Sequence, residues 1–375
     1  MKKIGIMTMH RVLNCGSALQ AYSLQQFLEN NGYDVEIIDY IYPNKYHKSY
    51  TDQRGIFRKF ASFIYHNFLI GDLRKLRSSF NRFYKKYLKL SPSKYRTINS
   101  LKINCPKYDC YISGSDQVWN PRYIRYDTSF MLSFVLNSPK ISYSSSFSVN
   151  SIPNEFKDIY ASCLKDYKHI SIRESSSSNI INELISKDST LVVDPTLLLE
   201  PSDFLEIAKS SNIVIDQPYI LVYVLGYAWD PYPYVVDIIN RIDEDLKLPI
   251  VVLSFNTKYL KRLNSSVVEY APTPENFIYL FSRAKFVITD SYHGTIFSVK
   301  YNVPFYSLVQ SDLSVDSRVK EFLKSIGAED RCLHDSDGHI DYNYNVNFQF
   351  IENKLYNIVE ASKKYLLEAL IDSLK

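Results

Sequence analysis

The stretch that decides the fold is Phe286-Val-Ile-Thr-Asp-Ser-Tyr-His-Gly-Thr-Ile-Phe-Ser-Val-Lys-Tyr-Asn-Val-Pro-Phe305. It opens with a short apolar run, Phe286–Thr289, that is typical of a buried strand. A polar turn follows, then a helical pattern that begins at Thr295 and stops near Pro304. Residues 305–309 have the pattern of the next strand. This order of strand, turn, helix and strand indicates an α/β fold with a parallel sheet.

His293 lies on the turn that follows the first of these strands. In open parallel sheets, ligands bind outside the carboxyl ends of the strands, where the N-termini of helices offer N–H groups to an anion. An imidazole at such a place can exchange protons with a substrate. It can equally well serve only to hydrogen-bond its own turn, and the pattern by itself allows both interpretations.

Strands alternate with helices on both sides of this stretch. We therefore predict an α/β fold of two Rossmann-like parallel-sheet domains that face a cleft. The expected bounds are 1–200 for the first domain, 201–345 for the second, and 346–375 for a terminal helix. The turn after the first strand has one glycine, Gly16, so it lacks the glycine pattern of a dinucleotide site. The expected strands are 4–9, 35–39, 108–113, 141–147, 169–173, 219–225, 250–255, 286–289 and 305–309. The expected helices are 14–32, 156–167, one capped by Ser175, 235–246, one capped by Thr273, 319–326 and 351–374.

Composition narrows the class of protein. The 375 residues are 46% hydrophobic, which suits large cores, and no run of 18 apolar residues is present. The five cysteines are scattered without the spacing of a zinc site, so we expect neither a metal nor a cofactor. Met1-Lys-Lys leads directly into a strand pattern without a secretory signal, and we expect a cytoplasmic protein.

The segment 45–102 is strongly basic. It holds fifteen basic and two acidic residues, a net charge of +13 that leaves −9 for the rest of the chain. Aromatic residues alternate with the charges, and helices over 56–70 and 72–89, separated by Gly71, are expected. Such helices suit an anionic membrane surface or an acidic glycan. Alternatively, the aromatic residues are core and the cations only solvate the surface. No nucleic-acid motif accompanies the charge.

Several short motifs occur in an order that resembles the polysaccharide pyruvyl transferase family over most of the chain. The motifs are Asn14-x-Gly16-x-x-Leu19-Gln20, Ile112-x-Gly114-Ser-Asp116-Gln117-Val-Trp119-Asn-Pro121, Ser171-Ile-Arg173-Glu174, Val193-Asp194-Pro-Thr196, Thr289-Asp-Ser-Tyr-His293-Gly294, and Asp316-Ser-Arg318-Val319. The resemblance implies two Rossmann-like domains in a glycosyltransferase-B-like arrangement. It also implies transfer of the enolpyruvyl group of phosphoenolpyruvate to a sugar as a cyclic ketal, with no cofactor.

The resemblance also suggests roles for individual residues. His293 and Asp116 are the expected catalytic groups. Arginine binds carboxylate and phosphate through two parallel hydrogen bonds, which suits a trianionic donor. The expected donor-binding residues are Arg173, Arg318, Ser291, Gly294 and Lys300. The expected acceptor-binding residues are Asn14, Gln20, Gln117 and Trp119.

Structural roles remain open for some of these residues. Arg173 can instead pair with Glu174, Asp116 can only orient its loop, and Asp194 before a proline reads as a structural turn. Ser291 stands where several family members have an arginine, so that donor charge must be met elsewhere, by Lys300 or Arg283, or the donor differs.

Two other functions stay open. One is a nucleotide-sugar glycosyltransferase, although no acid that would bind a ribose lies between Thr295 and Tyr306. The other is a non-catalytic glycan-binding relative. For a pyruvyl transferase, the acceptor is a saccharide, polymeric or lipid-linked. If the acceptor is lipid-linked, segment 45–102 would hold the enzyme against the cytoplasmic face of the membrane.

Overall fold

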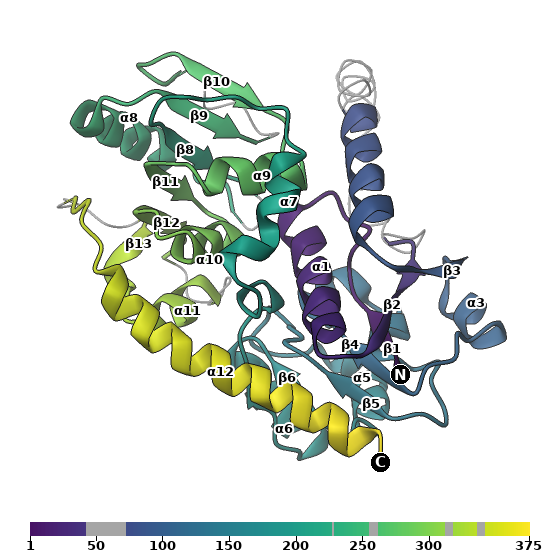
Figure 1. Ribbon diagram of the computed structural model, residues 1–375. Helices are drawn as coiled ribbons and strands as arrows, with labels where there is room; N and C mark the ends of the chain where they lie inside the picture. The colour runs from purple at the N-terminus through teal and green to yellow at the C-terminus, as the bar shows by residue number, and fades with distance from the viewer. Residues whose placement is uncertain (43–72, 227–228, 255–261, 312–317, 336–341) are drawn as a thin grey trace, which may run out of the picture. The chain divides into compact units, whose positions relative to one another are not determined.

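The computed structural model describes residues 1–42, 73–226, 229–254, 262–311, 318–335 and 342–375. By its internal contacts the chain divides into a first unit, Met1–Leu198 with Ser362–Lys375, and a second unit, Leu199–Ala361. Each unit is built around one parallel sheet (Figure 1). The expected α/β fold with two Rossmann-like parallel sheets is confirmed.

The first unit contains a five-stranded sheet in the order β3-β2-β1-β4-β5. Its strands are all parallel, and buried aliphatic residues such as Ile4, Ile6 and Ile112 fill the central ones because helices cover both faces. The strands are β1 (Lys3–Met7), β2 (Asp34–Tyr40), β3 (Leu90–Tyr95), β4 (Cys110–Ser113) and β5 (Lys140–Ser142), with a small pair, β6 (Ser171–Ile172) and β7 (Thr190–Leu191). The helices are α1 (Cys15–Asn30), 73–87, α3 (Ile98–Ile103), α4 (Pro121–Ile124), α5 (Asn154–Leu164) and α6 (Ser175–Ile185), with 3-10 turns η2 (Thr128–Met131) and η3 (Pro195–Leu197).

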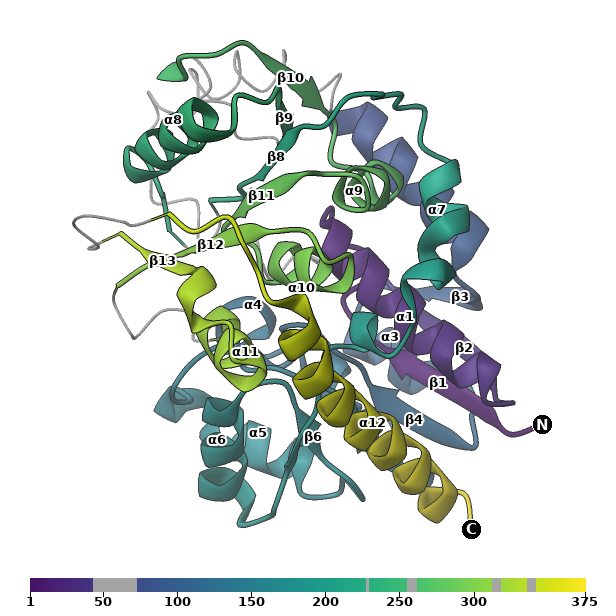
Figure 2. The same cartoon turned by 60° about the vertical axis from the view of Figure 1, so that its left-hand side comes forward.

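The second unit contains a six-stranded parallel sheet in the order β10-β9-β8-β11-β12-β13. Figure 2 shows α8 on one face of this sheet and α9 and α10 on the other. Side chains alternate accordingly, since Val222 packs in the cluster with α8 while Tyr223 contacts Phe277 of α9. The strands are β8 (Ile220–Tyr223), β9 (Ile250–Leu253), β10 (Val267–Tyr270), β11 (Phe286–Thr289), β12 (Phe305–Val309) and β13 (Cys332–His334). The helices are α7 (Leu205–Lys209), α8 (Tyr234–Leu246), α9 (Pro274–Phe281), α10 (Tyr292–Lys300) and α11 (Arg318–Ile326), with 3-10 turns η4 (Pro201–Phe204) and η6 (Glu329–Arg331).

The terminal helix α12 (Phe348–Ser373), yellow in Figure 1, contributes to both units. Near its start, Glu352 accepts a hydrogen bond from Asn302 at 2.6 Å. Near its end, Asp372 lies 3.0 Å from both Lys168 and His169. Among the helices of the described ranges, none is long and apolar enough to cross a membrane.

Two helix starts differ from those expected. Helix α10 begins at Tyr292, three residues before Thr295, because the Ser291 side chain accepts the N–H of Gly294 and caps the helix. His293 therefore lies in the first helical turn and not on a loop. Helix α6 begins with Ser175 as its first residue, and Glu174 occupies the cap position.

Part of the basic segment 45–102 belongs to the first sheet and is therefore not an insertion. Residues 43–72, which include the expected helix 56–70, lie outside the described residues. The next helix is observed over 73–87. After it the chain joins the sheet as β3, which the sequence did not reveal because Pro92 and polar residues interrupt its pattern. Pro92 is tolerated there since β3 is an edge strand.

Candidate functional site

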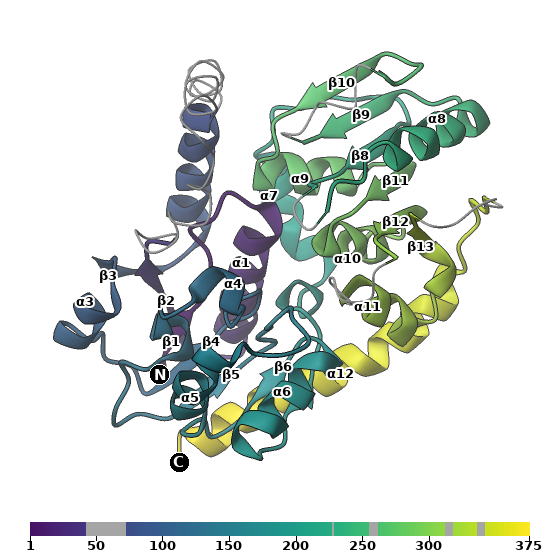
Figure 3. The same ribbon diagram turned by 180° about the vertical axis from the view of Figure 1, so that it is seen from behind.

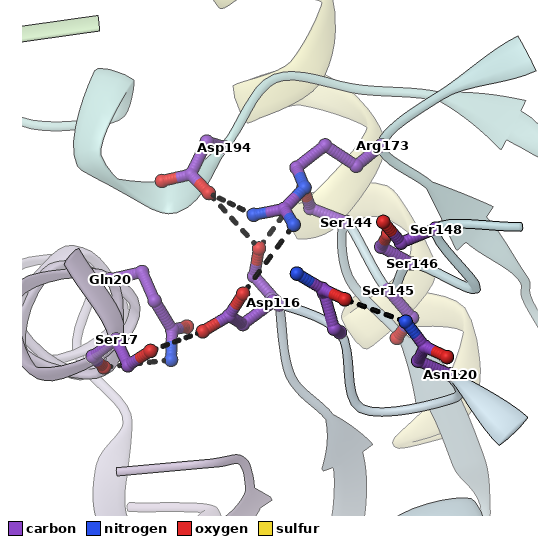
Figure 4. A network of polar contacts seen from close by, with 12 residues as sticks. Ser17, Gln20, Asp116, Asn120, Ser144, Ser145, Ser146, Ser148, Arg173 and Asp194 are labelled. Carbon is purple, nitrogen blue, oxygen red and sulfur yellow. Dashed lines mark hydrogen bonds and ion pairs between the residues drawn. The ribbon is translucent and has the colours of Figure 1, made fainter. Parts of the chain in front are cut away.

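Asp116 lies in the loop that follows β4, at the carboxyl edge of the first sheet. Its backbone has φ = 75°, a left-handed conformation that is uncommon for a residue with a side chain. One carboxylate oxygen accepts a hydrogen bond from the Ser17 hydroxyl in the first turn of α1, and the other lies 3.5 Å from Nη2 of Arg173 (Figure 4). The Asp116 side chain keeps 12% exposure, whereas that of Arg173 has none. Asp116 is thus the partner of this pair that keeps some contact with solvent.

Arg173 binds a second carboxylate, that of Asp194. Its Nη1 donates to Asp194 Oδ2 at 3.0 Å, and Ser115 Oγ donates to the same oxygen at 3.2 Å. The other Asp194 oxygen accepts from the N–H and hydroxyl of Thr196 and caps the turn that follows. One guanidinium therefore faces two carboxylates, which more than balance its single positive charge. The expected alternative of a pair with Glu174 is wrong, and Asp194 is more than a structural turn.

Glu174 has a separate set of partners. Its Oε1 accepts from Ser146 Oγ at 3.0 Å and from the N–H groups of Phe147 and Ser148 at 3.2 Å. It thereby fixes the serine-rich loop after β5.

Asp116, Ser144 and Ser148 are three of the eight residues other than glycine that have positive φ in the described ranges. Such strained conformations concentrate at functional sites, which supports this edge of the sheet as one.

The four expected acceptor-binding residues have structural partners. Gln20 is buried and donates to Thr8 Oγ1 at 2.9 Å, and Asn14 accepts the N–H of Ser17 and caps α1. The buried Trp119 ring packs against Phe147 and Tyr167 in the core. Gln20 and Trp119 are inaccessible to a glycan, which corrects the expectation for both.

Gln117 and Asn14 are the partly exposed members of that set. Gln117 lies in the loop that follows β4. Its Oε1 accepts from Asn120 at 2.6 Å, next to Asp116 in the chain. Together with Asn14 at the start of α1, it remains at the surface of the sheet edge. These two residues keep the acceptor role as a prediction.

In the second unit, the first turn of α10 follows β11 directly. Ser291 caps the helix, and Tyr292 and His293 are its first two residues. The rings of Tyr292 and His293 lie edge to face, with centres 5.6 Å apart. Arg318, the first residue of α11, places its guanidinium carbon 5.6 Å from the centre of the same Tyr292 ring. The structure thus brings Arg318 and His293, 25 positions apart in the sequence, to one aromatic ring.

Asp290 joins the ends of two neighbouring strands. Its two carboxylate oxygens accept the N–H groups of Leu225 and Gly226, both at 2.7 Å, in the turn after β8. Burial raises the pKa of Asp290 to about 6, although the two N–H groups act in the opposite direction. The sequence offered no sign of this contact, because the two partners come from a turn 64 residues earlier.

Gly294 and Lys300 have positions that argue against direct donor binding. A side chain on Gly294 would place its Cβ 2.3 Å from Thr289 Oγ1, so the glycine permits close packing of helix on strand. Lys300 is the last residue of α10, and its ammonium donates to the carbonyl of Leu199. It lies seven residues after His293, roughly 10 Å along the helix axis. This corrects the expectation that Lys300 replaces the arginine absent at position 291.

A hollow of about 440 Å³ lies elsewhere in the second unit, beside β9 and β10. Its lining includes Ile215, Tyr219, Val251 and Tyr270, with Asp216 as its carboxylate, and contains none of the residues described above. Within the described ranges, no three histidine, cysteine, aspartate or glutamate side chains gather as metal ligands would.

Comparison with known proteins adds a family and a fold. The family model of polysaccharide pyruvyl transferases matches residues 14–312. No curated protein matches the chain. Among solved structures, the UDP-GlcNAc 2-epimerase of Methanocaldococcus jannaschii is similar with a TM-score of 0.54, at 12% identity over 98% of this chain and 99% of its own. The enzyme of the same name from Rickettsia bellii has a TM-score of 0.54 and 10% identity, and the match covers 100% of this chain and 97% of that one. The UDP-GlcNAc 2-epimerase of Neisseria meningitidis, bound to UDP-GlcNAc, has a TM-score of 0.52 and 12% identity, and the match covers 99% of this chain and 100% of that one. These likenesses concern the fold, which is glycosyltransferase-B-like.

Proposed function

Because the chain belongs to the polysaccharide pyruvyl transferase family, we propose that it moves the enolpyruvyl group of phosphoenolpyruvate onto two hydroxyls of a saccharide. The product is a pyruvate ketal on a precursor of a surface polysaccharide, and the second product is phosphate. The observation that carries this proposal is the first turn of α10, where His293 and Arg318 share the Tyr292 ring at the carboxyl edge of the sheet.

The chemistry needs an acid, a base and cations. The terminal carbon of the donor takes up a proton, and a hydroxyl of the acceptor attacks the neighbouring carbon. Phosphate leaves with the electrons of its C–O bond, and the second hydroxyl closes the ketal. Two hydroxyl protons are lost in all, of which one balances the proton on the new methyl group and the other leaves with phosphate. No oxidant, metal or cofactor enters this balance.

In the second unit, His293 is the group we propose for proton transfer to the donor. It lies at the positive end of the α10 dipole, which favours the donor's negative charge. Arg318 adds a guanidinium, which binds carboxylate or phosphate through two hydrogen bonds. The Ser291 hydroxyl is occupied as the helix cap, so the anion would rely on the backbone and on Arg318.

In the first unit, Asp116 is the group we propose as the base for an acceptor hydroxyl. Ser17 and Arg173 hold its two oxygens from opposite sides, which fixes the orientation of the carboxylate (Figure 4). Arg173 and Asp194 then act as positioning residues, since the buried guanidinium is held by Asp194 and not exposed to a ligand. This replaces the direct donor contact that the sequence suggested for Arg173.

Thermal unfolding with different ligands tests the donor. A ligand at 100 times its Kd raises the free energy of unfolding by about 2.7 kcal/mol. We expect phosphoenolpyruvate to raise the melting temperature of the wild-type chain and to raise that of Arg318→Ala clearly less. UDP-GlcNAc is the contrasting ligand. A shift with UDP-GlcNAc and none with phosphoenolpyruvate would overturn the proposal in favour of a nucleotide-sugar enzyme.

Release of phosphate tests the reaction. Phosphoenolpyruvate is incubated with the chain and a panel of saccharides that carry adjacent or 4,6-placed hydroxyl pairs, and phosphate is measured with time. Acceptor-dependent release, together with a mass gain of one pyruvate less water on the saccharide, is the expected result. Binding of donor and saccharides without any transfer would indicate a glycan-binding relative.

A further inference from the structure

The exposed side of helix 73–87 is rich in cations. The fifteen residues of the helix include six basic residues and no acid. All six basic side chains are exposed, and we call this set the cationic face: Arg74, Lys75, Arg77, Arg82, Lys85 and Lys86. From Arg74 to Lys86 the face extends for about 18 Å along the helix axis, at 1.5 Å per residue. A surface of this length exceeds what one small anion can contact.

The apolar side of the same helix is buried. Leu76, Phe80, Phe83 and Tyr84 are all at most 3% exposed. A helix that lies in a membrane interface needs such residues to enter the lipid, and here they are committed to the protein. This corrects the interpretation of 72–89 as a helix that docks by its apolar face. Only the polar, positively charged side of the helix is therefore left to contact a partner.

The helix is attached to the carboxyl edge of the first sheet. The Tyr84 hydroxyl donates to the carbonyl of Val12 at 3.1 Å, and Arg11 donates to Asn81 at 3.3 Å, both in the loop that follows β1. Arg11 is itself held by Asp39 through two hydrogen bonds of 2.7 and 2.6 Å, so this attachment is fixed. Burial alone would raise the pKa of the Asp39 carboxyl, but hydrogen bonds from His10 and Arg11, together with the charge of Arg11, hold that pKa below its ordinary value.

The N-terminal half of the helix extends past this edge. Chain direction requires it, because Tyr87 leads toward the start of β3 while Asn81 is level with the loop at the end of β1. Figures 1 and 3 show the helix before β3, blue in both, standing beyond the strands of the first sheet. Arg74 and Arg77 thus lie on the side of the sheet where ligands bind in folds of this kind.

We propose that the cationic face binds an anionic glycan, so that the acceptor is a saccharide chain that carries carboxylate or phosphate groups. This inference rests on the proposed function, which supplies the acceptor. Exposed cations spread along a helix match negative charges that repeat along a polymer. Each exposed ion pair adds little to the free energy of binding, but several such pairs on one polymer add up to a useful affinity. The acidic polymer would be held by the helix while one of its sugars lies at the edge beside Asp116.

A triple variant of the complete chain tests the face. Arg74→Gln, Arg77→Gln and Lys85→Gln together remove three charges, and glutamine keeps the helix because its helix propensity is close to that of arginine and lysine. The matched control is Lys102→Gln, Lys107→Gln and Lys165→Gln, which removes three exposed charges elsewhere in the first unit. The probes are an oligogalacturonate, a neutral oligogalactose and phosphoenolpyruvate.

We expect the face variant to bind oligogalacturonate at least tenfold more weakly than wild type. We also expect the salt dependence of its binding to be less steep, because fewer counterions are exchanged. The control variant should stay within twofold for the same probe, and phosphoenolpyruvate should bind all three proteins equally. Equal weakening in the face and control variants, or no weakening in the face variant, would overturn the inference.

A second assay separates a glycan from a membrane and from the proposed reaction. Co-sedimentation with phosphatidylserine–phosphatidylcholine vesicles at low salt is compared for the same three proteins. Vesicle binding that the face variant loses, with oligogalacturonate binding unchanged, would assign the face to the membrane and overturn the inference. Glycan binding that depends on the face, without any phosphate release from phosphoenolpyruvate, would support the surface and overturn the proposed reaction alone.

Discussion

Arg173 Nη1 lies 3.0 Å from Asp194 Oδ2, and neither side chain is exposed to solvent. Asp194 begins the turn that ends the first unit's main segment, and Arg173 follows β6. The pair therefore links the segment after β6 to the turn at Asp194. Arg173 also lies 3.5 Å from the carboxylate of Asp116. A residue that the sequence offered as a donor-binding arginine is, in the structure, part of the support of a carboxylate.

Loss of this arginine should destabilise the fold. We expect Arg173→Ala to lower the free energy of unfolding by about 3–5 kcal/mol, because two carboxylates remain without their cation. Urea unfolding measures this, and Arg173→Ala with Asp194→Ala should cost less than the sum of the single changes. Lys209→Ala is the control, since its pair with Glu206 is exposed and contributes at most about 1 kcal/mol. Additive effects at Arg173 and Asp194 would contradict the pairing.

His293→Ala should lower turnover by about 10² or more while the fold stays intact, because a general acid or base contributes on that scale. Phosphate release under saturating donor measures turnover, and circular dichroism checks the fold. His334→Ala, a half-buried histidine at the end of β13, is the control and should keep its rate. A His293→Ala rate near wild type would remove this residue from the mechanism.

Arg318 and Lys300 should differ in their effect on the donor. We expect Arg318→Ala to weaken binding of phosphoenolpyruvate at least about tenfold, since a hydrogen bond to a charged group contributes about 1.5–3 kcal/mol. Arg318→Lys should recover part of the affinity. Lys300→Ala should stay within twofold, because its ammonium binds the Leu199 carbonyl at the far end of α10. Calorimetric titration gives the constants, and equal losses at both positions would contradict the site.

Asp290 should give the fold a dependence on pH. Its pKa is raised to about 6 from 3.8, so the folded chain holds the proton where the unfolded chain has lost it. Stability from this group is therefore present below about pH 4 and is lost as the pH rises to about 6, by up to about 3 kcal/mol. We expect Asp290→Asn to remove that dependence. Urea unfolding between pH 4 and 7 measures the difference, and parallel curves for both proteins would contradict the shift.

Gly294→Ala should act on stability and leave the donor's affinity unchanged. The added Cβ would lie 2.3 Å from Thr289 Oγ1, and such overpacking costs about 1–3 kcal/mol. Thr289→Ala removes that atom, so the double variant should lose less than the two single variants together. Thermal unfolding measures the losses. If Gly294→Ala keeps full stability but loses phosphoenolpyruvate, then the glycine contacts the donor after all.

The sequence determined much of the fold by itself. The apolar run Phe286–Thr289 became β11, and the amphipathic pattern Val235–Leu246 became most of α8, because hydrophobic periodicity records which side of an element is buried. Gly327, with φ = 69°, ends α11 as expected, since glycine adopts a left-handed conformation without strain. The sequence also placed His293 at a strand end, where α10 starts. These features depend on neighbours within a few residues along the chain.

Tertiary structure alone decided which charged and polar groups meet. Asp116 finds Arg173 across 57 positions, Asp290 finds Gly226 across 64, and Trp119 turns inward although its motif is polar. The same holds for helix 73–87, where packing against the loop after β1 separated a buried aromatic side from a cationic one. The physical reason is the distance along the chain over which each interaction acts. Periodicity and capping act locally, whereas the partner of a buried charge depends on how whole strands and helices pack, and short motifs do not encode that packing.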